Sequence, residues 1–203
     1  MKKYLTEAIG TFFLVLTVGC TVISNQPIAP LAIGAALMVM VFAGGHISGG
    51  HYNPAVTLGV WLRGRCPSGC VPFYWLSQIL GAAAASAVAT ILVGRPEQAP
   101  MSPAPLPSFI AEFAFTFALV YVVLNVATAK GTENNSFYGL AIGSTVMVGA
   151  FSVGAISGGA FNPAVAFGAA LMGLMSWSSI GFHIVAELAA AALAALVFKY
   201  ASK

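Results

Sequence analysis

The chain has 203 residues, of which 59% are hydrophobic and only 6% are charged, and aspartate does not occur in it. Such a small number of charged side chains cannot cover the surface of a water-soluble globular protein, so the composition excludes that class. We expect an all-α integral membrane protein that lies in the lipid bilayer and has no nucleic-acid partner.

Six apolar runs reach or approach the length that crosses a bilayer. A helical span needs about 20 residues to cross roughly 30 Å of hydrocarbon. The second run is shorter than this and stops where glycine becomes frequent. In chain order, the predicted spans are residues 4–23, 31–45, 71–93, 108–129, 137–155 and 178–200.

The basic residues predict how these spans are oriented in the cell membrane. In a six-span path with cytoplasmic ends, Arg95 lies outside, and the other basic residues lie on the cytoplasmic side. These are Lys2, Lys3, Arg63, Arg65, Lys130, Lys199 and Lys203. We therefore expect both termini in the cytoplasm. A basic start before an apolar run is also typical of a cleaved secretory signal, but Glu7 inside that run argues against cleavage.

The sequence contains an internal repeat. Residues 31–59 match residues 140–168 at 17 of 29 positions, and Glu7 aligns with Glu112. We therefore divide a single domain, residues 1–203, into repeat 1 (1–93), a proline-rich extracellular linker (94–107) and repeat 2 (108–203). Each repeat holds three spans, an odd number, so the second repeat enters the membrane from the opposite side and the repeats are inverted.

Each repeat also carries an Asn-Pro-Ala motif. Asparagine is a favoured helix N-cap and proline suits the first helical position, so each motif predicts the start of a helix. The two motifs are Asn53-Pro54-Ala55 and Asn162-Pro163-Ala164. A helix from Asn162 to about Gly173 spans only ~16 Å, half of the hydrocarbon. We expect two re-entrant half-helices that meet at their N-termini, each preceded by a non-helical Ile-Ser-Gly-Gly segment that lines a water-filled path.

The paired motifs, the stretch GHISGGHYNPAV and a Glu-x-x-x-Thr pattern in the first helix of each repeat resemble the aquaporin and glycerol-facilitator family, the major intrinsic proteins. The resemblance covers essentially the whole chain. It implies six tilted helices plus two half-helices, a pore within every protomer and a homotetramer. It also implies a passive channel for water or small uncharged solutes, which is not an enzyme and has no catalytic residues, cofactor or metal.

Several residues acquire expected roles from their positions in this pattern. The half-helix N-termini place partial positive charge at the pore centre and oppose cations, while Asn53 and Asn162 donate amide hydrogens to passing solutes. We expect the backbone carbonyls of residues 46–51 and 155–160 to serve as acceptors. The resemblance implies that Glu7 and Glu112 brace the re-entrant loops. His51 is expected to line the cytoplasmic vestibule, His46 and His183 to be structural, and Glu187 has no assigned role.

The residue after the second motif predicts unusual selectivity. Most family members have arginine there, in a narrow ring of four side chains near the outside. Here the ring positions implied by the family spacing are Ile33, Ala150, Gly159 and Val165. Such a ring has no fixed cation and no strong donor. One interpretation is an ordinary water channel, and the alternative is a channel for ammonia, glycerol, urea or arsenite, since this valine resembles a subset of bacterial members linked to arsenical export.

Two other classes of protein remain as remote alternatives. An intramembrane serine protease would pair Ser48 or Ser157 with His183, but a serine duplicated in both repeats is redundant for one nucleophile. An ion-coupled transporter would need carboxylates beside the helix breaks, and none lies within twenty residues of Asn53 or Asn162 along the chain. Cys66 and Cys70 form a weak metal signal without histidine neighbours, so no metal is assigned to them.

Overall fold

The computed structural model describes residues 1–202, and in that part of the chain the regular structure is almost entirely α-helical. Within these residues, eight α-helices follow one another, with short 3₁₀ turns after α3 and after α5. They are α1 (Lys2–Ile23), α2 (Ala29–Ser48), α3 (Pro54–Leu62), α4 (Val71–Val93), α5 (Pro105–Thr128), α6 (Tyr138–Ser157), α7 (Pro163–Met172) and α8 (Trp177–Ala201). Six of them are long and apolar enough to cross a membrane, which confirms the predicted all-α membrane fold.

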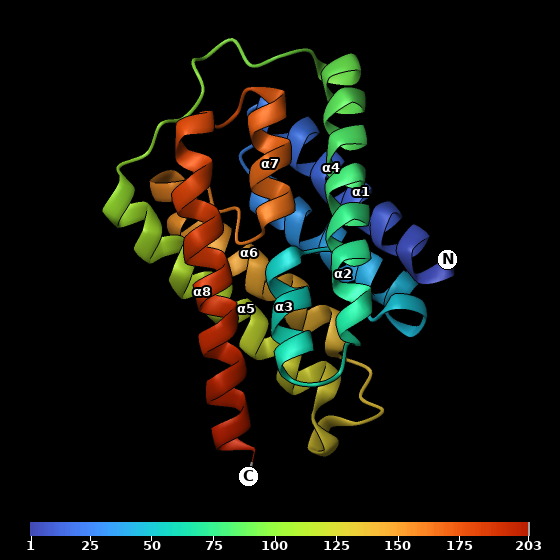
Figure 1. Cartoon of the computed structure of the whole chain (residues 1–203). Coiled ribbons are helices and arrows are strands. Elements are labelled where there is room, and N and C mark those ends of the chain that lie inside the picture. Colours follow the sequence, from blue (N-terminus) through green and yellow to red (C-terminus); the bar gives the residue numbers. More distant parts are fainter. Residues whose placement is uncertain (203) are drawn as a thin grey trace.

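The two short helices lie between the long ones and point in opposite directions. Helix α3 has 9 residues and α7 has 10, so each reaches only about half way across the hydrocarbon. Their N-terminal ends meet near the middle of the molecule, with α7 above and α3 below (Figure 1). The two half-helices together therefore replace one further span.

The repeat seen in the sequence is also visible in the order and packing of the helices. Helices α1 to α4 and α5 to α8 each run long, long, short, long. Each half-helix packs mainly on the last long helix of the other repeat, α3 on α8 and α7 on α4. Neither repeat can therefore bury its half-helix alone, and the two depend on each other.

Helices α2 and α6 approach closely because both carry glycine at the crossing. A methyl group at Gly34 would lie only 2.6 Å from the carbonyl oxygen of Gly143, and a methyl group at Gly143 would crowd Gly34 in return. Small residues let helix backbones approach in this way within membranes, where dispersion contacts replace the hydrophobic effect.

Several predicted boundaries differ from the structure. The predicted span 31–45 is in fact helix Ala29–Ser48, and the matching helix α6 ends at Ser157, so the Ile-Ser part of each Ile-Ser-Gly-Gly segment is helical. Gly49 and Gly158 then end the helices in the left-handed conformation, at φ +92°. Helix α5 starts at Pro105, because proline is tolerated in the first turn of a helix, and this shortens the linker.

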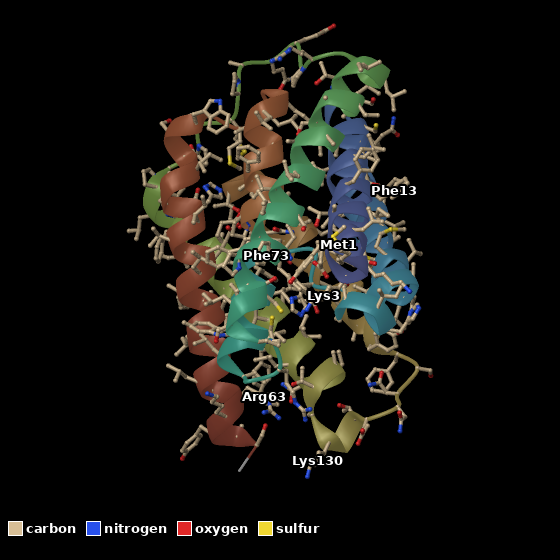
Figure 2. The ribbon with its side chains drawn as sticks, turned by 45° about the vertical axis from the view of Figure 1, so that its right-hand side comes forward. Met1, Lys3, Phe13, Arg63, Phe73 and Lys130 are labelled. Carbon is tan, nitrogen blue, oxygen red and sulfur yellow. The ribbon has the colours of Figure 1, made fainter. Side chains whose placement is uncertain are left out.

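The linker and several basic residues lie at opposite ends of the molecule. The linker between α4 and α5 crosses the top of Figure 1, whereas the C-terminus lies at the bottom. Arg63 and Lys130 lie near the bottom of Figure 2, and Lys3 lies near its middle. This separation is the arrangement on which the predicted orientation depends.

Candidate pore

The two Asn-Pro-Ala motifs begin the half-helices as the sequence predicts. The Asn53 side-chain oxygen accepts hydrogen bonds from the backbone N–H groups of Ala55, at 2.8 Å, and Val56, at 3.4 Å. The Asn162 oxygen accepts one from Ala164, at 2.9 Å. Each asparagine thus satisfies N–H groups that the first turn of a helix leaves without partners.

The amide nitrogens of the same asparagines join the two repeats, which the sequence did not reveal. Asn53 Nδ2 donates to the backbone oxygen of Phe161 at 2.8 Å, and Asn162 Nδ2 donates to that of Tyr52 at 2.9 Å. Tyr52 and Phe161 have left-handed φ angles of 51° and 49°, which turn their carbonyls toward the other repeat. Since each amide has two N–H groups, one on each asparagine is left to donate to a solute.

Glu7 holds the loop before α3 through its buried carboxylate. Oε1 accepts hydrogen bonds from the Ser48 hydroxyl at 2.7 Å and the His51 backbone N–H at 3.0 Å. Oε2 accepts from the Tyr52 backbone N–H at 2.6 Å and from Gln78 Nε2 at 2.9 Å. Because the carboxylate is fully buried, these donors replace the water that would otherwise solvate it.

Glu112 holds the loop before α7 in the corresponding way. It accepts hydrogen bonds from the Ser157 hydroxyl at 2.6 Å and from the backbone N–H groups of Ala160, at 3.1 Å, and Phe161, at 2.6 Å. His183 Nε2 lies 3.8 Å from Glu112 Oε1. The second loop therefore has an imidazole beside its carboxylate.

Glu187 lies where repeat 1 has Gln78. Its Oε1 accepts a hydrogen bond from the backbone N–H of Asn162 at 2.9 Å, so a carboxyl group does lie beside the second helix break. No carboxylate lies within twenty residues of either motif along the chain, but α8 packs against α7 and brings Glu187 next to Asn162 in space. His183, on the same helix, places its ring nitrogens 2.8 Å from Ser157 O and 2.9 Å from Ser179 O.

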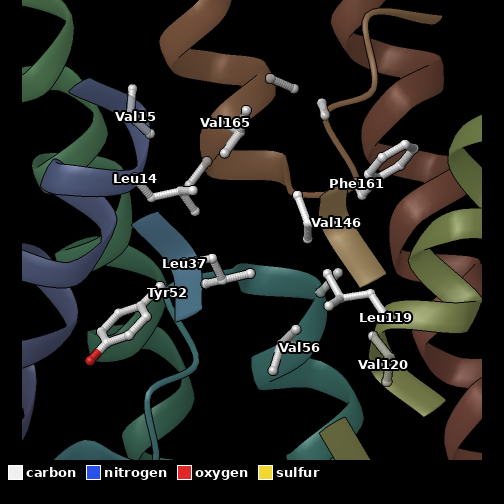
Figure 3. Packing of buried hydrophobic residues seen from close by; sticks show 14 of the residues in the cluster. Leu14, Val15, Leu37, Tyr52, Val56, Leu119, Val120, Val146, Phe161 and Val165 are labelled. Carbon is white, nitrogen blue, oxygen red and sulfur yellow. The ribbon is translucent and has the colours of Figure 1, made fainter. Parts of the chain in front are cut away.

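A cavity of about 350 Å³ runs from the linker side to the half-helix N-termini. The four predicted ring residues all line it, together with both capping asparagines: Ile33, Ala150, Gly159, Val165, Asn53 and Asn162. Figure 3 shows apolar side chains around the same space, among them Val165, Leu14, Val146, Leu37, Val56 and Leu119. The wall is thus apolar, with the polar groups concentrated at the motifs.

A second cavity of about 660 Å³ opens at the opposite end, among the loops after α3 and α5. His51 and Val123 line both cavities, so they lie where the two meet. His46 was expected to pack against its loop, but it is exposed and lines this second cavity, because the helix continues through it.

The hydrogen bonds of Thr57 fix the tautomer of His51. Thr57 Oγ1 donates its hydrogen to Asn53 O at 3.0 Å and accepts one from Gln78 Nε2. His51 Nδ1, 3.1 Å away, must therefore carry the hydrogen of this contact. In the neutral ring this leaves Nε2 as an acceptor at the junction of the two cavities.

Similarity to known proteins assigns the chain to a family. The sequence pattern of the family described as "Major intrinsic protein" matches residues 1–198. The chain belongs to the major intrinsic protein family. It is 36% identical to aquaporin NIP1-4 of Oryza sativa subsp. japonica, covering 98% of this chain and 76% of that protein. It is 32% identical to nodulin-26 of Glycine max, covering 98% and 77%.

A solved structure supports the fold as well. The aquaglyceroporin from Plasmodium falciparum superposes with a TM-score of 0.78 at 20% sequence identity, covering 100% of this chain and 95% of that one. At that identity the likeness concerns the fold alone. The recognition made from the sequence is confirmed, and the chain is a passive membrane channel for water and/or small uncharged solutes.

The geometry of this major intrinsic protein also argues against the two alternative classes, an intramembrane serine protease and an ion-coupled transporter. The Ser157 hydroxyl donates to Glu112, while His183 contacts the Ser157 backbone oxygen instead, so serine and histidine do not form a nucleophile and base pair. Glu7, Glu112 and Glu187 are fully buried and lie outside the wall of either described cavity, where a transported ion could not reach them.

None of the three cysteines lines the cavity that contains the ring residues. Within residues 1–202, Cys20, Cys66 and Cys70 are free thiols, and no group of three metal-ligating side chains comes together. Burial raises the pKa of the Cys66 thiol, and the neighbouring Cys70 raises it further. Cys66 lines the second cavity, and Lys3 Nζ donates to Cys70 Sγ at 3.0 Å.

Proposed function

We propose that this channel conducts small uncharged solutes, such as glycerol, urea, ammonia or arsenous acid, in addition to water. The observation that carries this proposal is the composition of the ring formed by Ile33, Ala150, Gly159 and Val165. Three aliphatic side chains and a glycine line the cavity there, with no guanidinium to narrow it or to donate to water. An apolar ring costs a less polar solute less desolvation than it costs water.

Ion exclusion is assigned to the junction of the half-helices. The N-termini of α3 and α7 converge there with their partial positive charges, which repel cations. The remaining N–H of Asn53 and of Asn162 donates to a passing oxygen, and His51 Nε2 accepts a hydrogen on the side of the second cavity. Water held by two donors at this point is poorly placed to relay a proton.

The assembly and orientation belong to the same proposal. Each chain forms its own pore, the chains assemble as a homotetramer, and the protein lies in the cell membrane with both termini in the cytoplasm. The positions of Arg63 and Lys130 toward one end, opposite the linker, support this orientation. The linker between α4 and α5, residues 94–104, then lies outside, and the 350 Å³ cavity faces the exterior.

Stopped-flow light scattering of proteoliposomes tests the proposed selectivity. Vesicles are challenged with an impermeant osmolyte, and then with glycerol, urea and arsenous acid at the same osmolarity. We expect shrinkage followed by re-swelling with at least one of these solutes. Shrinkage without re-swelling for every solute would contradict the proposal and leave a plain water channel. Flux that depends on a proton or sodium gradient would instead indicate a coupled transporter.

A further inference from the structure

The linker between α4 and α5 crosses the open end of the 350 Å³ cavity, here called the outer mouth, and is hydrogen-bonded to the loop after α7 at one residue. Met101 N–H donates to Leu174 O at 2.9 Å, and Ser176 N–H donates to Met101 O at 2.9 Å. These bonds form an isolated parallel bridge between Met101 and Met175, in the loop after α7. Most of residues 94–104 are exposed, so this bridge is what holds the linker over the channel.

The side chains of the bridged methionines both enter the outer cavity. Met101 and Met175 line the same 350 Å³ cavity as Val165 and Gly159. A methyl group at Gly158 would lie 2.8 Å from Met175 Cε and 3.8 Å from Met101 Sδ, so the two side chains converge on one point of the wall. Met175 is only 4% exposed, although it belongs to a loop.

We propose that Met101 and Met175 form a second, outer constriction and act with the ring at Val165 in selecting solutes. This proposal rests on the proposed function. A solute entering from the linker side must pass the two thioether side chains before it reaches Val165. Because methionine is flexible and polarisable and has no N–H or O–H donor, the pair provides bulk without hydrogen bonding. It therefore favours compact, weakly hydrated neutral solutes.

A purely structural role for the two methionines is the competing explanation. In that case their side chains would only fill space beneath the linker, and the backbone bridge alone would matter. Substitution by alanine keeps the backbone donors and acceptors of the bridge, so the two explanations differ in what happens to flux. Leu106, at the start of α5 and 70% exposed, provides a matched control at the same end of the molecule.

The test compares Met101→Ala, Met175→Ala, the double variant and Leu106→Ala in proteoliposomes, measuring water and glycerol permeability on each preparation. We expect the double variant to raise the glycerol-to-water ratio by roughly threefold. One methylene group changes the discrimination between two substrates by roughly tenfold in a rigid pocket. We expect a smaller change here because the flexible methionine side chain can move aside. Met101→Leu, which keeps the bulk, and Leu106→Ala should retain the wild-type ratio. Unchanged ratios and unchanged water permeability in all variants would overturn the proposal.

A labelling experiment keeps the proposal testable if the alanine variants fold poorly. Met101→Cys and Leu106→Cys are treated from outside with a membrane-impermeant thiol reagent, with the wild type as control for its own cysteines. We expect water flux to fall at least about twofold for Met101→Cys only, because the added group occupies the mouth. Equal insensitivity at both positions would contradict the outer constriction. Water flux reports on the constriction even if the wild type passes no glycerol, so failure of the proposed function is recognised separately.

Discussion

The two repeats build the same support for a half-helix with different chemistry. In repeat 1, Gln78 donates its amide hydrogens to Glu7 and Thr57. In repeat 2, Glu187 occupies the place of Gln78 and accepts a hydrogen bond from Asn162. Repeat 1 therefore surrounds one carboxylate with neutral donors, whereas repeat 2 buries two carboxyl groups next to an imidazole.

This difference separates the parts of the scaffold that the fold requires from the parts that can vary. Both repeats keep a glutamate that accepts two consecutive backbone N–H groups of the re-entrant loop. Both also keep the serine hydroxyl at the preceding helix end. The residue on the last long helix of the repeat varies, because its partners differ: Gln78 donates to Glu7, whereas Glu187 accepts from the backbone N–H of Asn162.

The largest effect is expected where the repeats agree. Glu7→Ala leaves the buried backbone N–H groups of His51 and Tyr52 without an acceptor, at about 1–3 kcal/mol each. We expect a large loss of thermal stability in detergent and loss of water flux. Glu112→Ala should behave in the same way. Glu97→Ala, in the exposed linker, is the control, and a Glu7→Ala protein as stable as this control would contradict the bracing role.

A smaller effect is expected at the caps, where the repeats also agree. Asn53→Asp keeps the capping oxygen but removes the N–H groups that reach Phe161 and the solute, and it adds negative charge at the centre. We expect proton or cation leak to increase while stability falls by about 1–3 kcal/mol, because the buried Phe161 carbonyl loses its donor. Collapse of a pH gradient, followed with a dye in vesicles, measures the leak. Asn162→Asp should leak equally, and tight vesicles in both cases would count against this mechanism of exclusion.

The reciprocal exchange between repeats sharpens the comparison further. Glu187→Gln introduces the residue that repeat 1 already uses, so we expect stability and flux close to wild type. Gln78→Glu removes the hydrogens donated to Glu7 and places a second carboxyl group beside it, which should cost about 1–3 kcal/mol. Thermal unfolding of the two variants side by side measures the asymmetry. If Gln78→Glu is the better tolerated exchange, the assignment of donors in repeat 1 is wrong.

The smallest effect concerns the mouths of the two cavities. Cys66 and Met175 lie 109 positions apart, at matching places in the repeats, and each lines the cavity at its own end. Because burial raises the Cys66 pKa, its thiolate forms at higher pH than that of an ordinary thiol. The rate of Cys66 alkylation, followed by mass spectrometry, should therefore rise at a higher pH than the rate of alkylation of free glutathione. Equal pH profiles would argue that the site is not buried in the membrane-bound protein.

The sequence predicted the fold well because the repeat and the motifs constrain it directly. Paired Asn-Pro-Ala segments predicted both half-helices, and the spacing of the family that the chain resembles pointed to Ile33, Ala150, Gly159 and Val165, which line one cavity. Residues brought together by α8 were not predictable, because nothing local indicates that Glu187 approaches Asn162. The bridge between Met101 and Met175 was missed for the same reason, since a single exposed-looking linker residue gives no periodic signal.

The most direct test of the central claim is a change of the ring itself. Val165→Arg and Val165→Met add comparable bulk, but only arginine adds charge and donors. Water and glycerol permeability are measured for both variants and the wild type in the same vesicles. We expect the glycerol-to-water ratio to be highest in the wild type, lower in Val165→Met and lowest in Val165→Arg. Equal ratios in all three proteins would show that this ring does not set the solute preference.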